Sequence, residues 1–214
     1  MPDGKRRGRA GRPGAGPLVR ATALLALGGA CTEGASWFLQ WRYPDRPVAP
    51  DLLLDALPYI EPARLLTSVA IFAAVVLFAI HAWRHEPQRI PDFVAMLAVM
   101  YLMRSVLLVL TPLANARDGL PAQFPLFQYG MFPSGHTAVV VLCAMWVDRR
   151  TAPGVKRVAV SLALVVCLGL LLAHSHYAID IAGGALLAYF VDREWRRGWL
   201  LEPVKRLVAP GEST

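Results

Sequence analysis

Six stretches of apolar sequence alternate with short polar loops, and they constrain the fold of this chain more than any other feature. A helix needs about 20 mainly apolar residues to cross the ~30 Å hydrocarbon core of a bilayer. Six such helices with short loops account for most of the 214 residues. We therefore expect an all-α integral membrane protein, built as a bundle of six transmembrane helices. The expected spans are residues 17–41, 65–83, 93–111, 132–147, 158–173 and 177–191.

Composition argues against three other classes of protein. Hydrophobic residues make up 56% of the chain and charged residues 17%, whereas soluble domains carry about 25% charged residues. The same hydrophobic content argues against a disordered chain. Three cysteines are too few for a disulfide scaffold. All three, Cys31, Cys143 and Cys167, fall inside expected spans, where a thiol packs as a small apolar group.

Basic side chains orient the expected bundle. Lys and Arg concentrate on the cytoplasmic side of membrane proteins. Of the 22 Lys and Arg residues, 17 lie in the N-terminal tail and its entry to the first span, the second-to-third loop, the fourth-to-fifth loop and the C-terminal tail. Both termini are therefore expected to be cytoplasmic. The net charge of +7 is then a signal of topology, and a nucleic-acid partner is not expected.

The chain is expected to divide into three segments. Gly, Pro and charged residues dominate residues 1–16 and 209–214, a composition that is typical of disordered tails. We expect a disordered basic cytoplasmic tail at residues 1–16, the six-helix membrane domain at 17–192 and a basic cytoplasmic tail at 193–214.

Ionisable side chains in the expected spans gather at one depth. A charged group in hydrocarbon costs several kcal/mol, so each such residue is a candidate for function. The outer halves of the spans and the loop ends beside them hold Glu33, Arg104, His136, His174, His176 and Asp180. This common depth predicts a polar site beneath the non-cytoplasmic surface.

The first local motif runs from Phe132 to Thr137, at the junction between a loop and a helix. Its Pro-Ser-Gly turn presents backbone N–H groups at the positive end of a helix dipole, which suits phosphate oxygens. Ser134 and Gly135 would then bind phosphate, with His136 beside it as a proton donor. The alternative is a capped helix with an interfacial histidine.

The second local motif is His176-Tyr177-Ala178-Ile179-Asp180. Residues at i and i+4 share a helix face, so Asp180 can accept a hydrogen bond from one ring nitrogen of His176. That bond fixes the tautomer and leaves the other nitrogen nucleophilic. A structural polar pair and a metal half-site are the alternatives. Zinc needs three well-placed ligands, and no Cys or Glu lies near His174 or His176 in sequence, so no metal is expected.

These motifs together resemble the membrane lipid phosphatase and phosphotransferase superfamily, the type 2 phosphatidic acid phosphatases (PAP2), over most of residues 20–192. The closer resemblance is to its sphingomyelin synthase-like branch. Four stretches carry it: the Pro- and Asp-rich Tyr43 to Pro58, Tyr101 to Leu113, Tyr129 to Thr137, and His174 to Asp180.

Several departures from the family pattern bear on the reaction. Pro133 precedes Ser134, as in the phosphatases, and Ala178 stands where the sphingomyelin synthase-like branch has Thr. The Lys-x6-Arg-Pro motif of the phosphatases is absent, as is the Ser-Arg pair before their nucleophilic histidine. These absences favour a head-group transferase over a simple phosphatase.

The resemblance implies a six-helix bundle with its site on the outer face and a two-step phosphoryl transfer. His176, oriented by Asp180, would form a phosphohistidine from a phospholipid, and His136 would act first as acid and then as base. Arg104 would stabilise the phosphate charge. Further substrate-binding candidates are Ser134, Gly135, Tyr177, Glu33 and His174.

The implied partners are a phospholipid donor, a lipid alcohol acceptor of the ceramide or diacylglycerol type and the bilayer itself, with no cofactor. A lipid phosphate or pyrophosphate phosphatase, which uses water as acceptor, is the first alternative. A non-catalytic membrane bundle is the second. The expected location is the cell membrane, with the site facing the non-cytoplasmic side.

Overall fold

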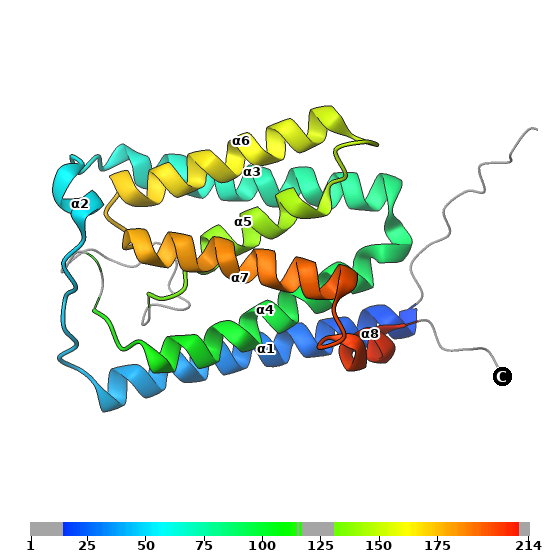
Figure 1. Cartoon of the computed structure of the whole chain (residues 1–214), viewed down its shortest axis with the longest axis horizontal. Coiled ribbons are helices and arrows are strands. Elements are labelled where there is room, and N and C mark those ends of the chain that lie inside the picture. The colour runs from blue at the N-terminus through cyan, green and yellow to red at the C-terminus, as the bar shows by residue number, and fades with distance from the viewer. Residues whose placement is uncertain (1–14, 115, 117–130, 210–214) are drawn as a thin grey trace, which may run out of the picture.

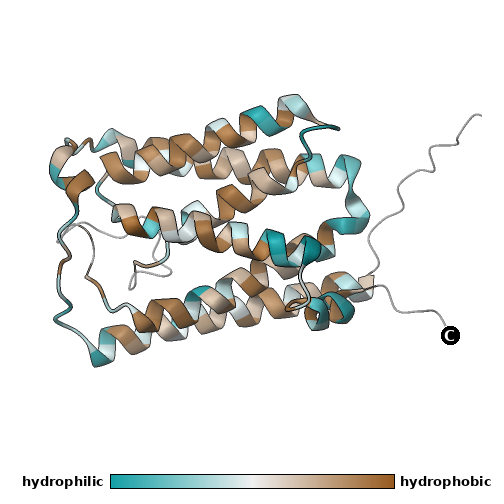
Figure 2. Ribbon diagram, viewed as in Figure 1, coloured by the Kyte–Doolittle hydropathy of each residue, from teal (hydrophilic) through white to brown (hydrophobic). Residues whose placement is uncertain are grey.

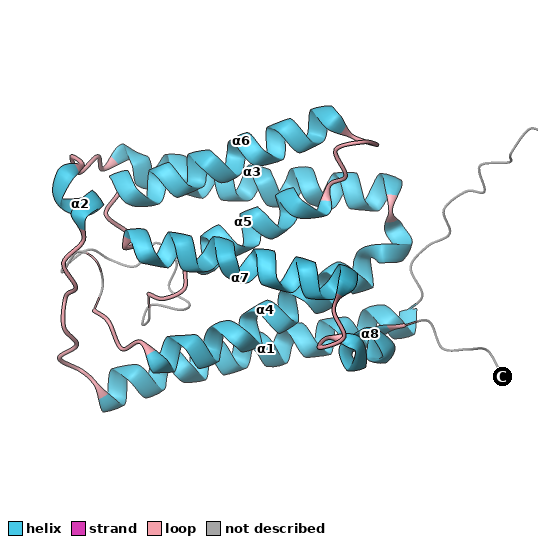
Figure 3. Ribbon diagram, in the orientation of Figure 1, coloured by secondary structure: helices cyan, strands magenta, loops and turns pink. Residues whose placement is uncertain are grey.

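The described part of the chain is helical. A computed structural model describes residues 15–114, 116 and 131–209, and within these residues the regular secondary structure consists of helices alone (Figure 3). The elements are α1 (Ala15–Arg42), α2 (Leu52–Ala56), α3 (Pro62–His85), the 3₁₀ helix η1 (Pro87–Arg89), α4 (Ile90–Leu110), α5 (Gly135–Trp146), α6 (Pro153–Leu172), α7 (Ala178–Arg197) and α8 (Glu202–Val208). The expected all-α class is confirmed for these residues.

Each of the six expected spans corresponds to one helix of 12 or more residues: α1, α3, α4, α5, α6 and α7. Among the described residues, α1, α3, α6 and the segment Pro87–Leu110 are long and apolar enough to cross a membrane. Helix α5 is apolar but has only 12 residues. Helix α7 carries charged residues through its last turns. The count of six crossings and the orientation of the termini therefore stay predictions.

The long helices alternate in direction along the bundle (Figure 1). Helix α1 packs along α4, α3 packs along α6, and α5 lies against α6 and α7. Helices α5 and α7 both begin at the end of the bundle where α2 lies, at the left of Figure 1. We call this the α2 end, and the opposite one the α8 end.

Small residues let several helix pairs approach closely. A Cβ atom on Gly28 of α1 would lie 2.9 Å from the carbonyl oxygen of Ala98 in α4. One on Gly169 of α6 would lie 2.2 Å from Oγ1 of Thr67 in α3. Such contacts are typical of helices that pack in a membrane, where close van der Waals contact replaces the hydrophobic effect.

Hydrophilic residues concentrate at the α8 end, whereas apolar residues cover the middle of the long helices (Figure 2). The aromatic rings of Phe78, Phe93 and Trp146 pack beneath this polar end, with the two Phe ring centroids 3.9 Å apart. This arrangement agrees with a bundle whose basic loops all lie on one side of a bilayer.

The C-terminal residues take more part in the bundle than a tail would. Helix α7 continues past the expected boundary at residue 192 to Arg197. Helix α8 then packs Val208 against Ala21 of α1 and Ala95 of α4. The guanidinium of Arg20 donates to the Ala209 carbonyl at 2.9 Å. The expected N-terminal tail, apart from Ala15 and Gly16 at the start of α1, lies outside the described residues.

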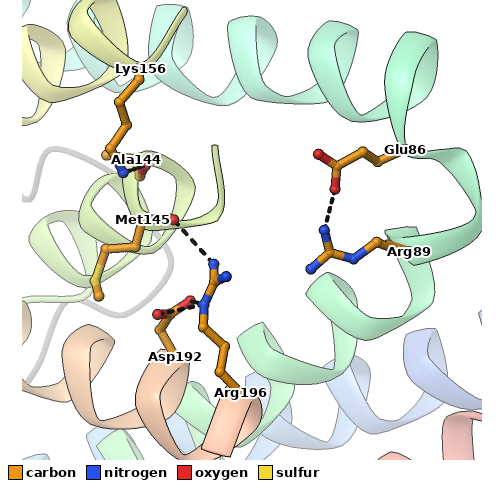
Figure 4. Close-up of polar contacts among 7 residues, drawn as sticks. All are labelled: Glu86, Arg89, Ala144, Met145, Lys156, Asp192 and Arg196. Carbon is orange, nitrogen blue, oxygen red and sulfur yellow. Dashed lines mark hydrogen bonds and ion pairs between the residues drawn. The ribbon is translucent and has the colours of Figure 1, made fainter. Parts of the chain in front are cut away.

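Basic side chains terminate the short helix α5 at the α8 end (Figure 4). Lys156 Nζ donates to the Ala144 carbonyl at 2.7 Å, and Arg196 Nη2 donates to the Met145 carbonyl at 3.2 Å. Arg196 Nε also contacts both carboxylate oxygens of Asp192, at 2.8 and 2.9 Å. The last carbonyls of a helix lack intrahelical donors, so these cations satisfy groups that would otherwise be unpaired in the bundle.

The turn into α4 is held in a similar way. Arg89 pairs with Glu86 within the turn (Figure 4). Its guanidinium carbon lies 4.4 Å from the centroid of the Trp146 ring. The contact joins η1 to the end of α5. Helix α5 therefore holds both the connection between α3 and α4, through Arg89, and the start of α6, through Lys156.

Replacing Arg196 with Gln is expected to destabilise the protein, because it removes the cation that is hydrogen-bonded to the buried Asp192 carboxylate and a donor to α5. The expected cost is about 1–2 kcal/mol, or a thermal midpoint lower by roughly 2–8 °C. The measurement is thermal unfolding of the detergent-solubilised protein. Arg197→Gln, which removes an exposed arginine next in sequence, is the control and should leave the midpoint within a degree or so of wild type. Equal midpoints for the two variants would contradict the capping role.

Candidate active site

Ser134 starts helix α5 and ties it to α7. Its hydroxyl oxygen accepts a hydrogen bond from the Thr137 N–H at 3.3 Å, so Ser134 is the N-cap of the helix. Its own backbone N–H donates to the carbonyl of Asp180 at 2.9 Å. The residue is fully buried. These contacts make Ser134 a part of the junction between α5 and α7, and they direct the following residues, Gly135 and His136, toward α7.

Two consecutive glycines in α7 make room for this junction. A Cβ atom on Gly184 would lie 2.4 Å from the Ser134 carbonyl oxygen, and one on Gly183 would lie 2.4 Å from the Phe132 ring. Neither glycine was among the site residues expected from the sequence. A Gly-Gly pair inside an otherwise regular helix is the signal that could have indicated it, because it marks a close approach of another backbone.

His176 and Asp180 are in contact, as the spacing predicts, but for a different reason. Nδ1 of His176 lies 3.2 Å from Oδ2 of Asp180. The sequence argument placed both residues on one helix, whereas His176 precedes the N-cap residue Tyr177. Asp180, in the first turn of α7, reaches back instead and also accepts the Tyr177 N–H at 3.0 Å. The carboxylate is fully buried and His176 is 7% exposed.

His136 and His176 face one another across the junction of α5 and α7. Their ring centroids are 5.8 Å apart and their planes meet at 70°. Nδ1 of His176 is engaged by Asp180, so its Nε2 is the ring nitrogen left for chemistry. Two imidazoles at this distance can act on the same substrate, one as the nucleophile and the other as the proton donor.

Arg104 reaches the start of α5 from α4. Its Nε donates to the Pro133 carbonyl at 2.9 Å, and the residue is 4% exposed. A Cβ atom on Gly135 would lie 3.2 Å from the same nitrogen, so the guanidinium packs directly against this glycine. A guanidinium beside a helix N-terminus adds its charge to the positive end of the helix dipole, which favours an anion there.

Tyr177 and His174 contact the segment that joins α1 to α3. The Tyr177 hydroxyl accepts the Ala49 N–H at 3.2 Å, and the tyrosine is 1% exposed. Nε2 of His174 lies 3.2 Å from the Leu57 carbonyl, and its ring meets that of Tyr59 edge-on at 5.7 Å. His174 has a φ of 45°, which fits the sharp turn between α6 and α7. The contacts of both residues favour a structural role at the α2 end.

Glu33 lies on α1 and accepts a hydrogen bond from the indole of Trp37 at 3.0 Å. Trp37 is an exposed residue of the same helix. This contact is internal to α1, so it does not join Glu33 to α5 and α7. A role for Glu33 in binding substrate stays a prediction.

A metal site was not expected, and in the described ranges no group of three or more His, Cys, Asp or Glu side chains is arranged to hold a metal ion. Among the described residues, the ionisable groups at the junction of α5 and α7 include Arg104, Asp180 and the two imidazoles.

Comparison with protein families connects this geometry to known chemistry. Residues 131–193 match the sequence model of a family described as PAP2 superfamily C-terminal. The match supports the PAP2 superfamily. It spans α5, α6 and nearly all of α7 and so contains His136, His176 and Asp180, while Arg104 lies outside it. It supports lipid phosphatase or phosphotransferase activity in general, and with the apolar helices it supports an integral membrane protein. Comparison with curated proteins gave no match.

Replacing Gly184 with Ala is expected to separate the start of α5 from α7, because the added methyl group would overlap the Ser134 carbonyl. Overpacking of this kind costs about 1–3 kcal/mol, so the thermal midpoint in detergent should fall by roughly 2–12 °C. Gly29→Ala in α1 is the matched control, since a Cβ atom there meets nothing within 4 Å. A Gly184→Ala midpoint equal to that of Gly29→Ala would show that the two helices are not in backbone contact.

Proposed function

We propose that this protein is a membrane lipid phosphotransferase that moves a phospho-head group from a phospholipid to a lipid alcohol through a phosphohistidine intermediate. The observation that carries the proposal is the meeting of His136 and His176 at 5.8 Å, with Asp180 bonded to one ring. The match to the PAP2 superfamily supports the same class of chemistry.

His176 is the proposed nucleophile of the first step. Its Nδ1–H donates to Asp180, so the lone pair of Nε2 attacks the phosphorus of the donor lipid. The new P–N bond forms as the P–O bond to diacylglycerol breaks. His136, protonated at this stage, gives its proton to the departing oxygen.

His136 has the opposite role in the second step. Now neutral, it removes the proton of the acceptor hydroxyl, and the resulting oxygen attacks phosphorus. The P–O bond to the acceptor forms, the P–N bond breaks and His176 is regenerated with its ring neutral. One pair of imidazoles thus serves both half-reactions with no net change in the enzyme.

Arg104 and the N-terminus of α5 are proposed to hold the phosphate. The guanidinium is fixed beside Gly135 by its bond to the Pro133 carbonyl. Positive groups held in place before the reaction stabilise the charge that develops on the phosphoryl oxygens. We assign Ser134 to the positioning of this helix start, because its hydroxyl is the N-cap.

A lipid phosphate or pyrophosphate phosphatase is the second candidate, favoured by the description of the matched family. It differs in one step only, since water replaces the lipid alcohol as the acceptor that His136 deprotonates.

The proposed location is the cell membrane, with the site on the non-cytoplasmic side. The site residues lie at the α2 end, where α5 and α7 begin, whereas hydrophilic and basic residues concentrate at the α8 end (Figure 2). The positive-inside rule assigns the α8 end to the cytoplasm.

Replacing His176 or His136 with Ala is expected to reduce turnover of the donor lipid more than roughly a thousand-fold, because each ring takes part in bond making or proton transfer. The assay is release of diacylglycerol from phosphatidylcholine, phosphatidylethanolamine or phosphatidic acid by the purified protein. His85→Ala, which removes an exposed histidine at the α8 end, is the control. Wild-type turnover in either site variant would eliminate the mechanism.

A phosphoryl ester with a p-nitrophenol leaving group separates the two roles. Its departure needs no proton, so His136→Ala should still release about one equivalent of p-nitrophenol in a burst, whereas His176→Ala should release none.

A second assay distinguishes the transferase from the phosphatase. With head-group-labelled lipid, wild-type protein plus ceramide should yield labelled lipid product. Labelled free phosphate or head group without transfer would favour the phosphatase.

Replacing Arg104 with Gln is expected to lower kcat for lipid turnover by about a hundred- to a thousand-fold, as loss of one preorganised donor does in other enzymes. Arg104→Lys keeps the charge but loses the planar donor to Pro133, so it should recover part of this loss. The measurement is steady-state kinetics in mixed micelles. A kcat within twofold of wild type in Arg104→Gln would remove the residue from phosphate binding.

A further inference from the structure

The segment that joins α1 to α3, residues 43–61, is tied to the start of α7. Helix α2 lies within it, at the α2 end of the bundle beside the end of α6 (Figure 1). Hydrogen bonds connect this segment to the last residue of α6, to the turn between α6 and α7 and to the start of α7. They run from Ile60 N to Leu172 O at 2.8 Å, between His174 and Leu57 O at 3.2 Å, from Ala49 N to the Tyr177 hydroxyl at 3.2 Å, and from Ala178 N to Asp51.

Asp51 is the one side chain in this set that caps two helices. Its Oδ1 accepts the N–H groups of Leu53 and Leu54 at 2.9 and 3.2 Å, which makes it the N-cap of α2. Its Oδ2 accepts the N–H of Ala178, the first residue of α7. The carboxylate therefore bridges two helix N-termini that lie far apart in sequence, and its negative charge suits both.

The Ala178 N–H comes directly after the Tyr177 N–H, which is hydrogen-bonded to the carboxylate that contacts His176. Tyr177 N–H donates to Asp180 Oδ2, the same oxygen that contacts His176. The other oxygen of Asp180, Oδ1, is buried and has no hydrogen-bond partner among the residues that the structure describes. If Asp51 did not accept the Ala178 N–H, this oxygen would be a competing acceptor in the same turn. Its competition would rotate the Asp180 carboxylate away from His176.

We infer that Asp51 is a positioning residue for His176. It holds the first amide of α7, so that the Asp180 carboxylate keeps its orientation toward the imidazole. The inference rests on the proposed function for its catalytic meaning, while the bridge itself is a property of the fold. A residue that served only to cap α2 would need just one of its two oxygens.

Asp51→Asn separates the two tasks of this side chain. Asparagine is as good an N-cap as aspartate, so its single carbonyl oxygen can still cap α2. Its NH₂ group takes the place of Oδ2 and cannot accept the Ala178 N–H. The matched control is Asp55→Asn, which removes an exposed carboxylate from the same short helix.

The first measurement is steady-state turnover of the donor lipid. Asp51→Asn is expected to lower kcat by about 10- to 100-fold while KM changes by less than about twofold, because the loss affects alignment of the nucleophile and not binding of the lipid. Asp55→Asn should match wild type in both constants. An unchanged kcat in Asp51→Asn, or a rise in KM alone, would overturn the positioning role.

The second measurement does not depend on activity. Hydrogen–deuterium exchange should become at least several-fold faster for the amides of residues 178–181 in Asp51→Asn, while residues 53–56 keep their protection. Unchanged exchange at the start of α7, or faster exchange confined to α2, would overturn the inference. If wild-type protein turns over no lipid phosphate, the proposed function fails, and exchange at α7 still decides whether Asp51 holds this helix.

Discussion

The hydrogen bond from the Ser134 N–H to the Asp180 carbonyl is the contact on which the rest of the site depends. It joins the first turn of α5 to the first turn of α7, and it is possible only because Gly184 leaves no side chain between the two backbones. His136 lies two residues after Ser134, and His176 is bonded to the side chain of Asp180. One backbone contact therefore sets the distance between two side chains from different helices, and a shift of either helix would move one imidazole away from the other.

Buried charge at this junction is balanced by local hydrogen bonds. The Arg104 guanidinium donates to Pro133, and the Asp180 carboxylate accepts from Tyr177 and contacts His176. Both residues are almost wholly buried. Buried charges are costly unless they are paired or hydrogen-bonded, and they contribute little net stability even then. Their presence here is better explained by the chemistry of an anionic substrate, which agrees with the match of residues 131–193 to the PAP2 superfamily.

At both ends of the bundle, polar side chains form hydrogen bonds with backbone groups at helix termini. At the α8 end, Lys156 and Arg196 satisfy the last carbonyls of α5 (Figure 4). At the α2 end, the first turns of α5 and α7 are capped by Ser134, Asp51 and Asp180. Helix α5 has only 12 residues, so both of its termini lie within the bundle and both need partners from neighbouring helices. The short helix is thereby held in place along its axis, which gives its first residues a definite position against α7.

Local spacing in the sequence determined the helical class, the six main helices and the contact between His176 and Asp180, because each follows from residues near one another in the chain. It also indicated a polar site from the depth of the ionisable residues, but with the wrong geometry for His176, which precedes α7. Only the tertiary structure decided that His136 meets His176, that Arg104 packs on Gly135, that His174 contacts the α1–α3 segment and that Asp51 bridges to Ala178. The physical reason is that these contacts depend on how closely whole helices approach. That approach is set by small residues such as Gly184, whose effect appears only when the second helix is in place.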